Sequence, residues 1–396
     1  MYKINEKKSS RLYYFDYLKA FIIMLVIFLH SMLPYVKDYI WYVSEANKSD
    51  VFVLLSLIID IFIMPIMFFI AGYFTYRSFK KYGTKEFIRN KTNRILLPFI
   101  LGVLFLSPIM GYLSVLARGM QINYLEYWVS IYFKNFISSE HAAHYWFLAL
   151  LFVFYLLFVL IYRIYGKKID KLYDKSAKIN KSQVNIFILG FFAFGILFFF
   201  LVSLISPDDS WISLFNILVF QPTRATIYLL YFFLGIFVYL NNYKISDSFL
   251  KKIPAFITGS FFLTLIYLVF KIYFLSLSSR PIGFKLINSI LHFSLCFSIF
   301  FTLILIFKRY LNKSIAALNP LAKNSYSIYF IHMIIVVIIQ YLLLPYSISV
   351  YYKAAVSFTA ALLLSYILSE LYLNFYDYLV NHNKEYALLK QQEQEN

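Results

Sequence analysis

The chain has 396 residues, of which 61% are hydrophobic, 22% aromatic and 14% charged, whereas a soluble domain carries about 25% charged residues. So few polar side chains cannot cover a surface that faces water, which excludes a soluble globular fold and indicates an integral membrane protein. Lysine and arginine outnumber aspartate and glutamate by 37 to 19. In a membrane protein this excess gathers in cytoplasmic loops, so it does not indicate a nucleic-acid partner.

Ten apolar runs are long enough to cross the hydrocarbon core, which takes about 20 helical residues. They predict an all-α polytopic fold with spans at 18–35, 51–73, 95–116, 145–165, 184–205, 225–240, 254–274, 286–307, 325–344 and 354–375. A shorter run, 211–220, ends in Gln221-Pro222-Thr223-Arg224. It is too short to span, and we interpret it as a re-entrant or interfacial piece before the sixth span.

The loop charges predict the orientation of these spans. An even number of spans places both termini on one side, and the segments on that side carry 27 lysines and arginines against seven on the other. The positive-inside rule therefore predicts cytoplasmic termini, in a multi-pass protein of the plasma (inner) membrane. We expect a cytoplasmic segment at 1–17, a single transmembrane domain at 18–375 and a cytoplasmic tail at 376–396. The first span lacks a cleavage site and is expected to be retained.

Ionisable residues inside the spans are the first candidates for function, because a charge at the bilayer centre costs at least about 2.5–3.5 kcal/mol. His30 lies in the outer part of the first span and suits general-base chemistry, although a hydrogen bond to a neighbouring helix would also explain it. Asp60 lies near the middle of the second span. A carboxylate at that depth needs a partner, and we expect it to orient His30.

Other polar residues share the outer half of the membrane with His30. His141 and His144 precede the fourth span, Arg224 opens the sixth and His292 lies in the eighth. Each has a simple structural explanation, but their common depth predicts a cavity that opens outward. No metal site is expected, because cysteine ligands and a further nearby histidine are lacking.

Four candidates lie toward the cytoplasmic side. Lys19 precedes His30 by eleven residues on the same helix, and Asp16 lies one turn before Lys19. A snorkelling lysine paired with an interfacial aspartate is as good an explanation as a functional role. Lys91 and Arg94 are suited to phosphate binding, but basic residues in this loop are more simply explained as topology determinants.

One polar residue lies about halfway across the ninth span. His332 follows Ser325 and Tyr329 by one to two turns. A hydrogen-bonding role between helices is at least as good an interpretation of it as chemistry.

Five motifs resemble those of the membrane-bound acyltransferase 3 family, over residues 11–375. They are Tyr14-Phe-Asp16-Tyr-Leu-Lys19-x10-His30, Met64-Pro65-Ile-Met-Phe-Phe-Ile-Ala-Gly72, Lys91-Thr-Asn-Arg94-Ile-Leu-Leu-Pro98, His144-Tyr-Trp146-Phe-Leu148 and Ser325-Tyr-Ser-Ile-Tyr329-Phe-Ile-His332. Each motif is weak alone, but all five occur in the family's order. The chain is most similar to stand-alone members of the type that succinylate glucans or modify exopolysaccharides. It departs from the family pattern at positions 19 and 91, where lysine replaces arginine and offers a point charge in place of a planar fork.

The resemblance implies a function and a set of roles. Family members pass an acyl group, often acetyl or succinyl, from a cytoplasmic donor such as acyl-CoA to a hydroxyl of an extracytoplasmic glycan. His30 and Asp60 would then be catalytic. The donor side would comprise Lys19, Asp16, Lys91 and Arg94, and the acceptor side His144, Trp146, Arg224 and His332. Acyl-CoA would be a co-substrate, and no bound cofactor is expected.

Two other classes of protein compete with an enzyme. A transporter of polysaccharide or lipid-linked glycan would use the outer cavity and Asp60 as a proton relay. Transporters usually show inverted repeats and helices broken by glycine or proline, and only 11 glycines with no visible internal symmetry argue against one here. A sensor or structural component of a polysaccharide export complex is the third class.

Overall fold

The computed structural model describes residues 11–135, 142–174, 181–208, 210–214, 217–243, 245–275 and 281–395. His141 lies outside the described residues.

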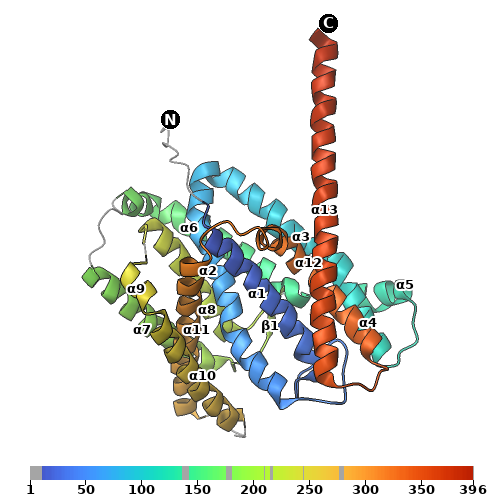
Figure 1. Cartoon of the computed structure of the whole chain (residues 1–396), viewed down its shortest axis with the longest axis horizontal. Coiled ribbons are helices and arrows are strands. Elements are labelled where there is room, and N and C mark those ends of the chain that lie inside the picture. The colour runs from blue at the N-terminus through green and yellow to red at the C-terminus, as the bar shows by residue number, and fades with distance from the viewer. Residues whose placement is uncertain are drawn as a thin grey trace.

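Helices make up nearly all of the described chain (Figure 1). The α-helices are α1 (Tyr13–Met32), α2 (Asp50–Lys91), α3 (Leu97–Leu101), α4 (Ser107–Ala117), α5 (Tyr124–Glu126), α6 (Trp146–Asp174), α7 (Lys181–Ile205), α8 (Pro222–Leu240), α9 (Asp247–Lys251), α10 (Ile253–Leu275), α11 (Ile282–Tyr310), α12 (Asn319–Leu343) and α13 (Val350–Glu395). Short 3-10 turns lie at Leu33–Tyr35 and Ala143–Tyr145, and π-helical turns at Thr92–Leu96, Gly102–Leu106 and Tyr127–Phe133.

Within these described ranges, nine helical stretches are long and apolar enough to cross a membrane. One of them, Asp50–Ala117, contains both the second and the third predicted span. The chain breaks its helical course at Gly83, whose φ of 73° is open to glycine but strained for other residues. The prediction of an all-α, multi-pass membrane protein is confirmed. The side of the membrane on which the termini lie stays a prediction.

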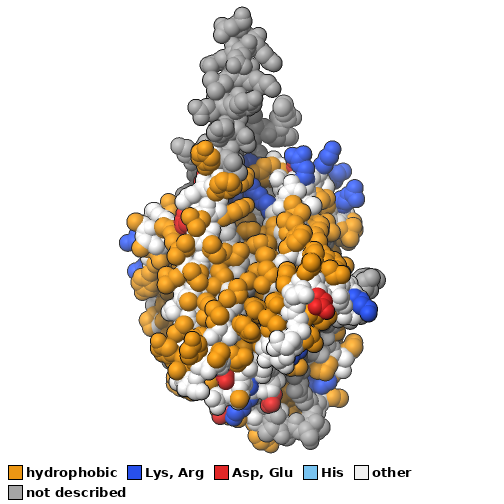
Figure 2. Space-filling model, turned by 90° about the vertical axis from the view of Figure 1, so that its right-hand side faces the viewer, with side chains coloured by type: hydrophobic (Ala, Val, Ile, Leu, Met, Phe, Trp, Pro, Cys, Tyr) orange, Lys and Arg blue, Asp and Glu red, His pale blue; other side chains and the backbone are white. Residues whose placement is uncertain are grey.

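The outer helices face lipid. In α10, only 11% of the most apolar 18-residue window is buried inside the protein, although its mean hydropathy is 2.0. An apolar helix with so little protein around it must have hydrocarbon as its solvent. Figure 2 shows another face of the molecule. Hydrophobic side chains cover its middle, and lysines and arginines gather toward the end from which α13 protrudes.

Inner helices form the core and place the polar residues. Helix α2 packs most extensively on α8, and α1 lies between α2 and α12. The end of α1 that carries His30 therefore meets the middle of α12. We call this the histidine end of the bundle, and the end where α1 begins the opposite end.

The run 211–220 forms a short antiparallel hairpin. Strand β1 (Ile212–Leu214) pairs with β2 (Leu218–Phe220), with Ile212 opposite Phe220. Helix α8 follows directly, with Pro222 in its first turn, where a missing backbone N–H costs nothing. The prediction that this run does not span is confirmed, and the hairpin places Arg224 in the first turn of α8.

Candidate active site

Two imidazole rings meet where α1 packs on α12. His30 Nδ1 lies 3.0 Å from His332 Nε2, and the rings are parallel to within 3° with centroids 5.2 Å apart. The other nitrogen of His332, Nδ1, lies 2.6 Å from the backbone oxygen of Tyr329. The two histidines are 302 positions apart in the sequence, so helix packing alone creates the pair.

These two contacts determine the tautomers when both rings are neutral. A carbonyl oxygen only accepts, so His332 Nδ1 carries the proton and donates it to Tyr329. His332 Nε2 is then the acceptor, and His30 Nδ1 donates to it. His30 Nε2 is left with a free lone pair, which is what a general base or a nucleophile needs.

A tryptophan and a glutamine hold the backbone and ring of His30. Gln340 Nε2 donates to the backbone oxygen of His30 at 3.0 Å, and its Oε1 accepts from Trp41 Nε1 at 2.8 Å. The Trp41 ring lies 5.7 Å from the His30 ring. Neither residue is among the sequence candidates. Gln340 carried a signal, since it is a lone amide in the apolar run 325–344.

His144 completes a group of three imidazoles, which we call the histidine cluster: His30, His144 and His332. Its ring centroid lies 4.9 Å from that of His332 and 6.4 Å from that of His30. The side chain is buried and lies near the backbone of Tyr329 and Phe330, but neither ring nitrogen makes a well-formed hydrogen bond with the described residues. Leaving such a group unpaired costs about 1–3 kcal/mol.

The backbone before His144 is strained. Ala143 has a φ of 45°, a left-handed conformation that costs a residue with a side chain about 1–3 kcal/mol. The backbone oxygen of His144 accepts from the Tyr329 hydroxyl at 2.7 Å, so the strained turn is fixed to α12. An unpaired imidazole held by a strained turn is an arrangement suited to receiving a ligand.

The other predicted outer residues form a second group, the ion-pair cluster: Asp60, Asp208, Arg224, Lys271 and His292. Arg224 lies 3.4 Å from Asp60 and 3.5 Å from Asp208. Lys271 Nζ lies 3.0 Å from the other oxygen of Asp208, and His292 Nε2 lies 3.2 Å from Arg224. The structure thus brings Asp60 to Arg224, whereas His30 has His332 as its ring partner.

Asp208 is the centre of this second cluster. Burial alone would raise the pKa of its carboxyl, but the attraction of Lys271 and Arg224 outweighs burial and holds that pKa well below its usual range. Asn288 Nδ2 also donates to it, at 3.2 Å. The cluster is therefore a set of fixed, mutually paired charges. Sequence reasoning missed Asp208, which lies in the loop between α7 and β1.

Trp146 lies beside α8. Its ring is near-parallel to that of Tyr228, with centroids 5.8 Å apart, and 5.7 Å from Trp211 of the hairpin. Its ring thus contacts α8 and the segment before β1, two residues after His144 in the chain.

The predicted donor residues lie toward the opposite end. Lys19 precedes His30 by eleven residues, about 16 Å along α1. Asp16 pairs with Arg11 at 2.8 Å, while Lys19 makes no ion pair or hydrogen bond with the described chain. Lys91 Nζ lies 4.1 Å from the ring centroid of Tyr155, a cation–π contact.

The Arg94 side chain is exposed, and its backbone oxygen accepts from Tyr326 of α12 at 2.6 Å. The guanidinium group is thus accessible, and the backbone that carries it is held to α12.

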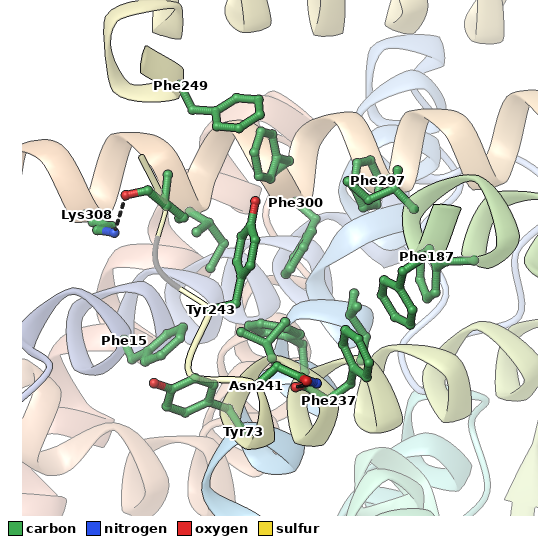
Figure 3. Close-up of a pocket in the computed structure, with 18 of the residues that line it drawn as sticks. Phe15, Tyr73, Phe187, Phe237, Asn241, Tyr243, Phe249, Phe297, Phe300 and Lys308 are labelled. Atoms are coloured by element: carbon green, nitrogen blue, oxygen red, sulfur yellow. Dashed lines mark hydrogen bonds between the residues drawn. The ribbon is translucent and has the colours of Figure 1, made fainter. Parts of the chain in front are cut away.

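A cavity of about 430 Å³ opens among the helices at the opposite end (Figure 3). Aromatic rings from α1, α2, α7, α8 and α11 line it, among them Phe15, Tyr73 and Phe300. Its polar groups are few: Lys308 Nζ donates to the Ile245 backbone oxygen at 3.2 Å, and Asn241 and Tyr243 lie nearby. Phe15 precedes His30 by 15 residues, about 22 Å along α1. This cavity is the larger of the two described, but the group with a free lone pair lies at the histidine end.

Comparison with known proteins agrees with the geometry. A family profile described as an acyltransferase domain matches residues 12–371. The chain is also similar to glucans biosynthesis protein C of Escherichia coli strains K12, O1:K1 and O9:H4, at 28% identity over 245 residues. The alignment covers 60% of this chain and 60% of each relative's length. No solved structure matches significantly.

Proposed function

Because the chain belongs to the acyltransferase 3 family, we propose that it transfers an acetyl or succinyl group from a cytoplasmic donor such as acyl-CoA to a hydroxyl of an extracytoplasmic glycan. The observation that carries this proposal is the free lone pair on His30 Nε2, which follows from the His30–His332–Tyr329 hydrogen bonds. The similarity to a protein named for glucan biosynthesis supports a glycan as the acceptor.

The lone pair serves two routes. As a general base, His30 Nε2 takes the proton of the acceptor hydroxyl while its oxygen attacks the thioester carbonyl; the C–S bond breaks and the thiolate leaves. As a nucleophile, Nε2 itself attacks the thioester and forms an N–C bond as the thiolate leaves. The acceptor oxygen then attacks the acyl carbon, the N–C bond breaks, and the hydroxyl proton passes to the freed Nε2 and from there to the thiolate. In both routes, the Nδ1 proton stays in the hydrogen bond to His332 and keeps the ring oriented.

The donor enters from the opposite end in this proposal. Lys19, the guanidinium of Arg94 and Lys91 supply positive charge for its phosphates, and Asp16 holds Arg11 beside them. The thioester arm has to cover about 16 Å from Lys19 to His30. His144 and Trp146 face the acceptor in this proposal, while Arg224, also expected on the acceptor side, is engaged by Asp60 and Asp208.

Mass spectrometry of cell-surface and secreted glycans tests the proposal. A deletion strain is compared with strains restored with the wild-type protein, with His30→Ala and with His292→Gln, a matched control in the ion-pair cluster. We expect an acetyl- or succinyl-sized mass to be lost in the deletion and in His30→Ala but kept in the control, at equal protein abundance. An unchanged ester profile with an altered glycan amount would contradict acyl transfer and favour transport or export.

The sidedness of the two ends has its own test. Cys296 is buried, so a single introduced cysteine is the only one open to a membrane-impermeant maleimide. Met120 at the histidine end and Tyr82 at the opposite end are 45% and 46% exposed, which makes Met120→Cys and Tyr82→Cys a matched pair. We expect labelling of intact cells only at position 120. The reverse pattern would overturn the predicted orientation.

A further inference from the structure

A second cavity, of about 260 Å³, lies at the histidine end of the bundle. Its walls come from α4, from the π-helical turn Tyr127–Phe133 and from the loop after α1. It is lined by Tyr42, Ser107, Gly111, Ser114, Val115, Arg118, Tyr127, Ile131, Tyr132 and Asn135. None of these residues is among those assigned a role above.

Aromatic rings connect this cavity to His30. Tyr42 lines the cavity, and its ring centroid lies 5.3 Å from that of Trp41. Trp41 lies in turn 5.7 Å from the His30 ring and donates to Gln340, which holds the His30 backbone. A ligand in the cavity is therefore separated from His30 by two aromatic side chains.

The cavity offers hydroxyl groups to a ligand. Ser107 Oγ is buried without a well-formed hydrogen bond among the described residues, beside the Tyr132 hydroxyl, which donates to the backbone oxygen of Val103. Tyr127 also lines the cavity, and its hydroxyl occupies the space that a Cβ at Gly111 would fill. Unpaired buried hydroxyls cost free energy unless a ligand or water pairs with them.

These groups have the chemistry that recognises a sugar. Tyrosine rings pack on the apolar face of a pyranose, and hydroxyl, amide and guanidinium groups hydrogen-bond its hydroxyls. Among the described residues that line the cavity, Arg118 is the only charged one. This charge favours a neutral or anionic sugar over a cationic amino sugar.

We propose that this cavity binds one neutral or anionic sugar residue of the acceptor glycan, adjacent to the residue that is acylated at His30. The inference rests on the proposed acyltransferase function and adds a specificity subsite to it. Ser107, Tyr127 and Arg118 hold the sugar, and Tyr42 and Trp41 set its distance from His30.

Binding and kinetics of the full-length protein in lipid nanodiscs test the subsite. Short glucose oligosaccharides serve as the probe, with Tyr127→Phe and Ser107→Ala as variants that remove one hydroxyl each. Tyr124→Phe is the matched control, since Tyr124 lies on the same segment outside the cavity lining. For each cavity variant we expect the KM for the oligosaccharide to rise about 5- to 10-fold, the effect of one hydrogen bond. We expect kcat, and acyl-CoA hydrolysis without acceptor, to change less than about twofold.

The outcomes separate this inference from the proposed function. An unchanged KM in both cavity variants, with normal acyl-CoA turnover, would overturn the subsite and leave the acyltransferase standing. A wild-type protein that neither hydrolyses acyl-CoA nor acylates the probe would overturn the function instead. Direct binding of the probe, measured by calorimetry, then decides the subsite alone: equal affinity of wild type and Tyr127→Phe, or displacement of the probe by inorganic phosphate, contradicts it.

Discussion

The histidine cluster and the ion-pair cluster lie at the same end of the bundle but satisfy their polar groups in opposite ways. In the ion-pair cluster, Asp208 contacts Lys271, Arg224, Asn288 and the Thr223 hydroxyl. In the histidine cluster, and among the described residues, neither ring nitrogen of His144 makes a well-formed hydrogen bond, and His30 makes one only through Nδ1. Both clusters are built from side chains that lipid excludes.

The difference supports the histidine cluster, and not the ion-pair cluster, as the proposed place of the chemistry. Buried charges that pair with one another hold helices in register, and within the described chain only Arg224 of the ion-pair cluster keeps a buried side-chain nitrogen without a hydrogen bond. Buried imidazoles that stay unpaired cost free energy and are retained where a ligand completes their hydrogen bonds. Common depth alone, which led the sequence analysis to group all these residues, does not separate the two roles.

We expect the largest loss of activity from a substitution in the histidine cluster. His30→Gln replaces the imidazole by an amide of similar reach and removes the basic Nε2 lone pair. We therefore expect acyl transfer by the purified protein to fall about 10²- to 10⁴-fold, the usual contribution of a general base. The rate is measured as ester formed per folded molecule. A loss below about tenfold, at normal folded yield, would remove His30 from the reaction.

A substitution in the ion-pair cluster should act on stability. Asp208→Asn leaves Lys271 and Arg224 buried with less opposite charge, which costs about 3–5 kcal/mol for a broken buried pair. We expect a much lower thermal midpoint and folded yield in detergent, followed by size-exclusion chromatography. Turnover per folded molecule should change less than about threefold. A normal midpoint with lost turnover would show that the ion-pair cluster is itself chemical.

The sequence was sufficient for the helices because a lipid-facing span needs only a long apolar run, and such runs are read without knowing the packing. It also singled out His30, His144 and His332, which the structure brings together, although it placed His332 about halfway across its span. It did not show that Asp60 turns toward Arg224, because the rotation of a helix about its axis depends on its neighbours.

Loop residues were the least accessible to sequence reasoning. Trp41 and Asp208 lie outside the spans, where a polar or aromatic residue is unremarkable, and only the fold brings them against His30 and Lys271. The resemblance to the family supplied the chemistry, but the tautomer of His30 required the contact between α1 and α12.

We expect a smaller loss of activity from a substitution of Gln340, which holds the backbone of His30. Gln340→Met keeps the volume but loses the hydrogen bonds to the His30 backbone and to Trp41. Because Gln340 only positions His30, we expect kcat to fall about tenfold, as for one or two hydrogen bonds, while KM for the donor stays constant. Trp41→Phe removes the hydrogen bond between Trp41 and Gln340, and it should decrease kcat by a similar factor. A kcat equal to wild type in both variants would limit Gln340 to packing.

The smallest expected effect extends the comparison to two lysines. Lys271 is paired with Asp208 at 3.0 Å, whereas Lys19 has no ion pair with the described chain. By the same reasoning, Lys19 is the lysine available to a ligand. We expect Lys19→Gln to raise the KM for acyl-CoA several-fold with an unchanged thermal midpoint, and Lys19→Arg to lower it about two- to fivefold, because a guanidinium binds a phosphate with two parallel hydrogen bonds. Lys271→Gln should show the reverse pattern, a lower midpoint with an unchanged KM. If Lys19→Gln instead lowers the midpoint and leaves the KM for acyl-CoA unchanged, the absence of an ion pair does not mark a binding residue at this end of the bundle.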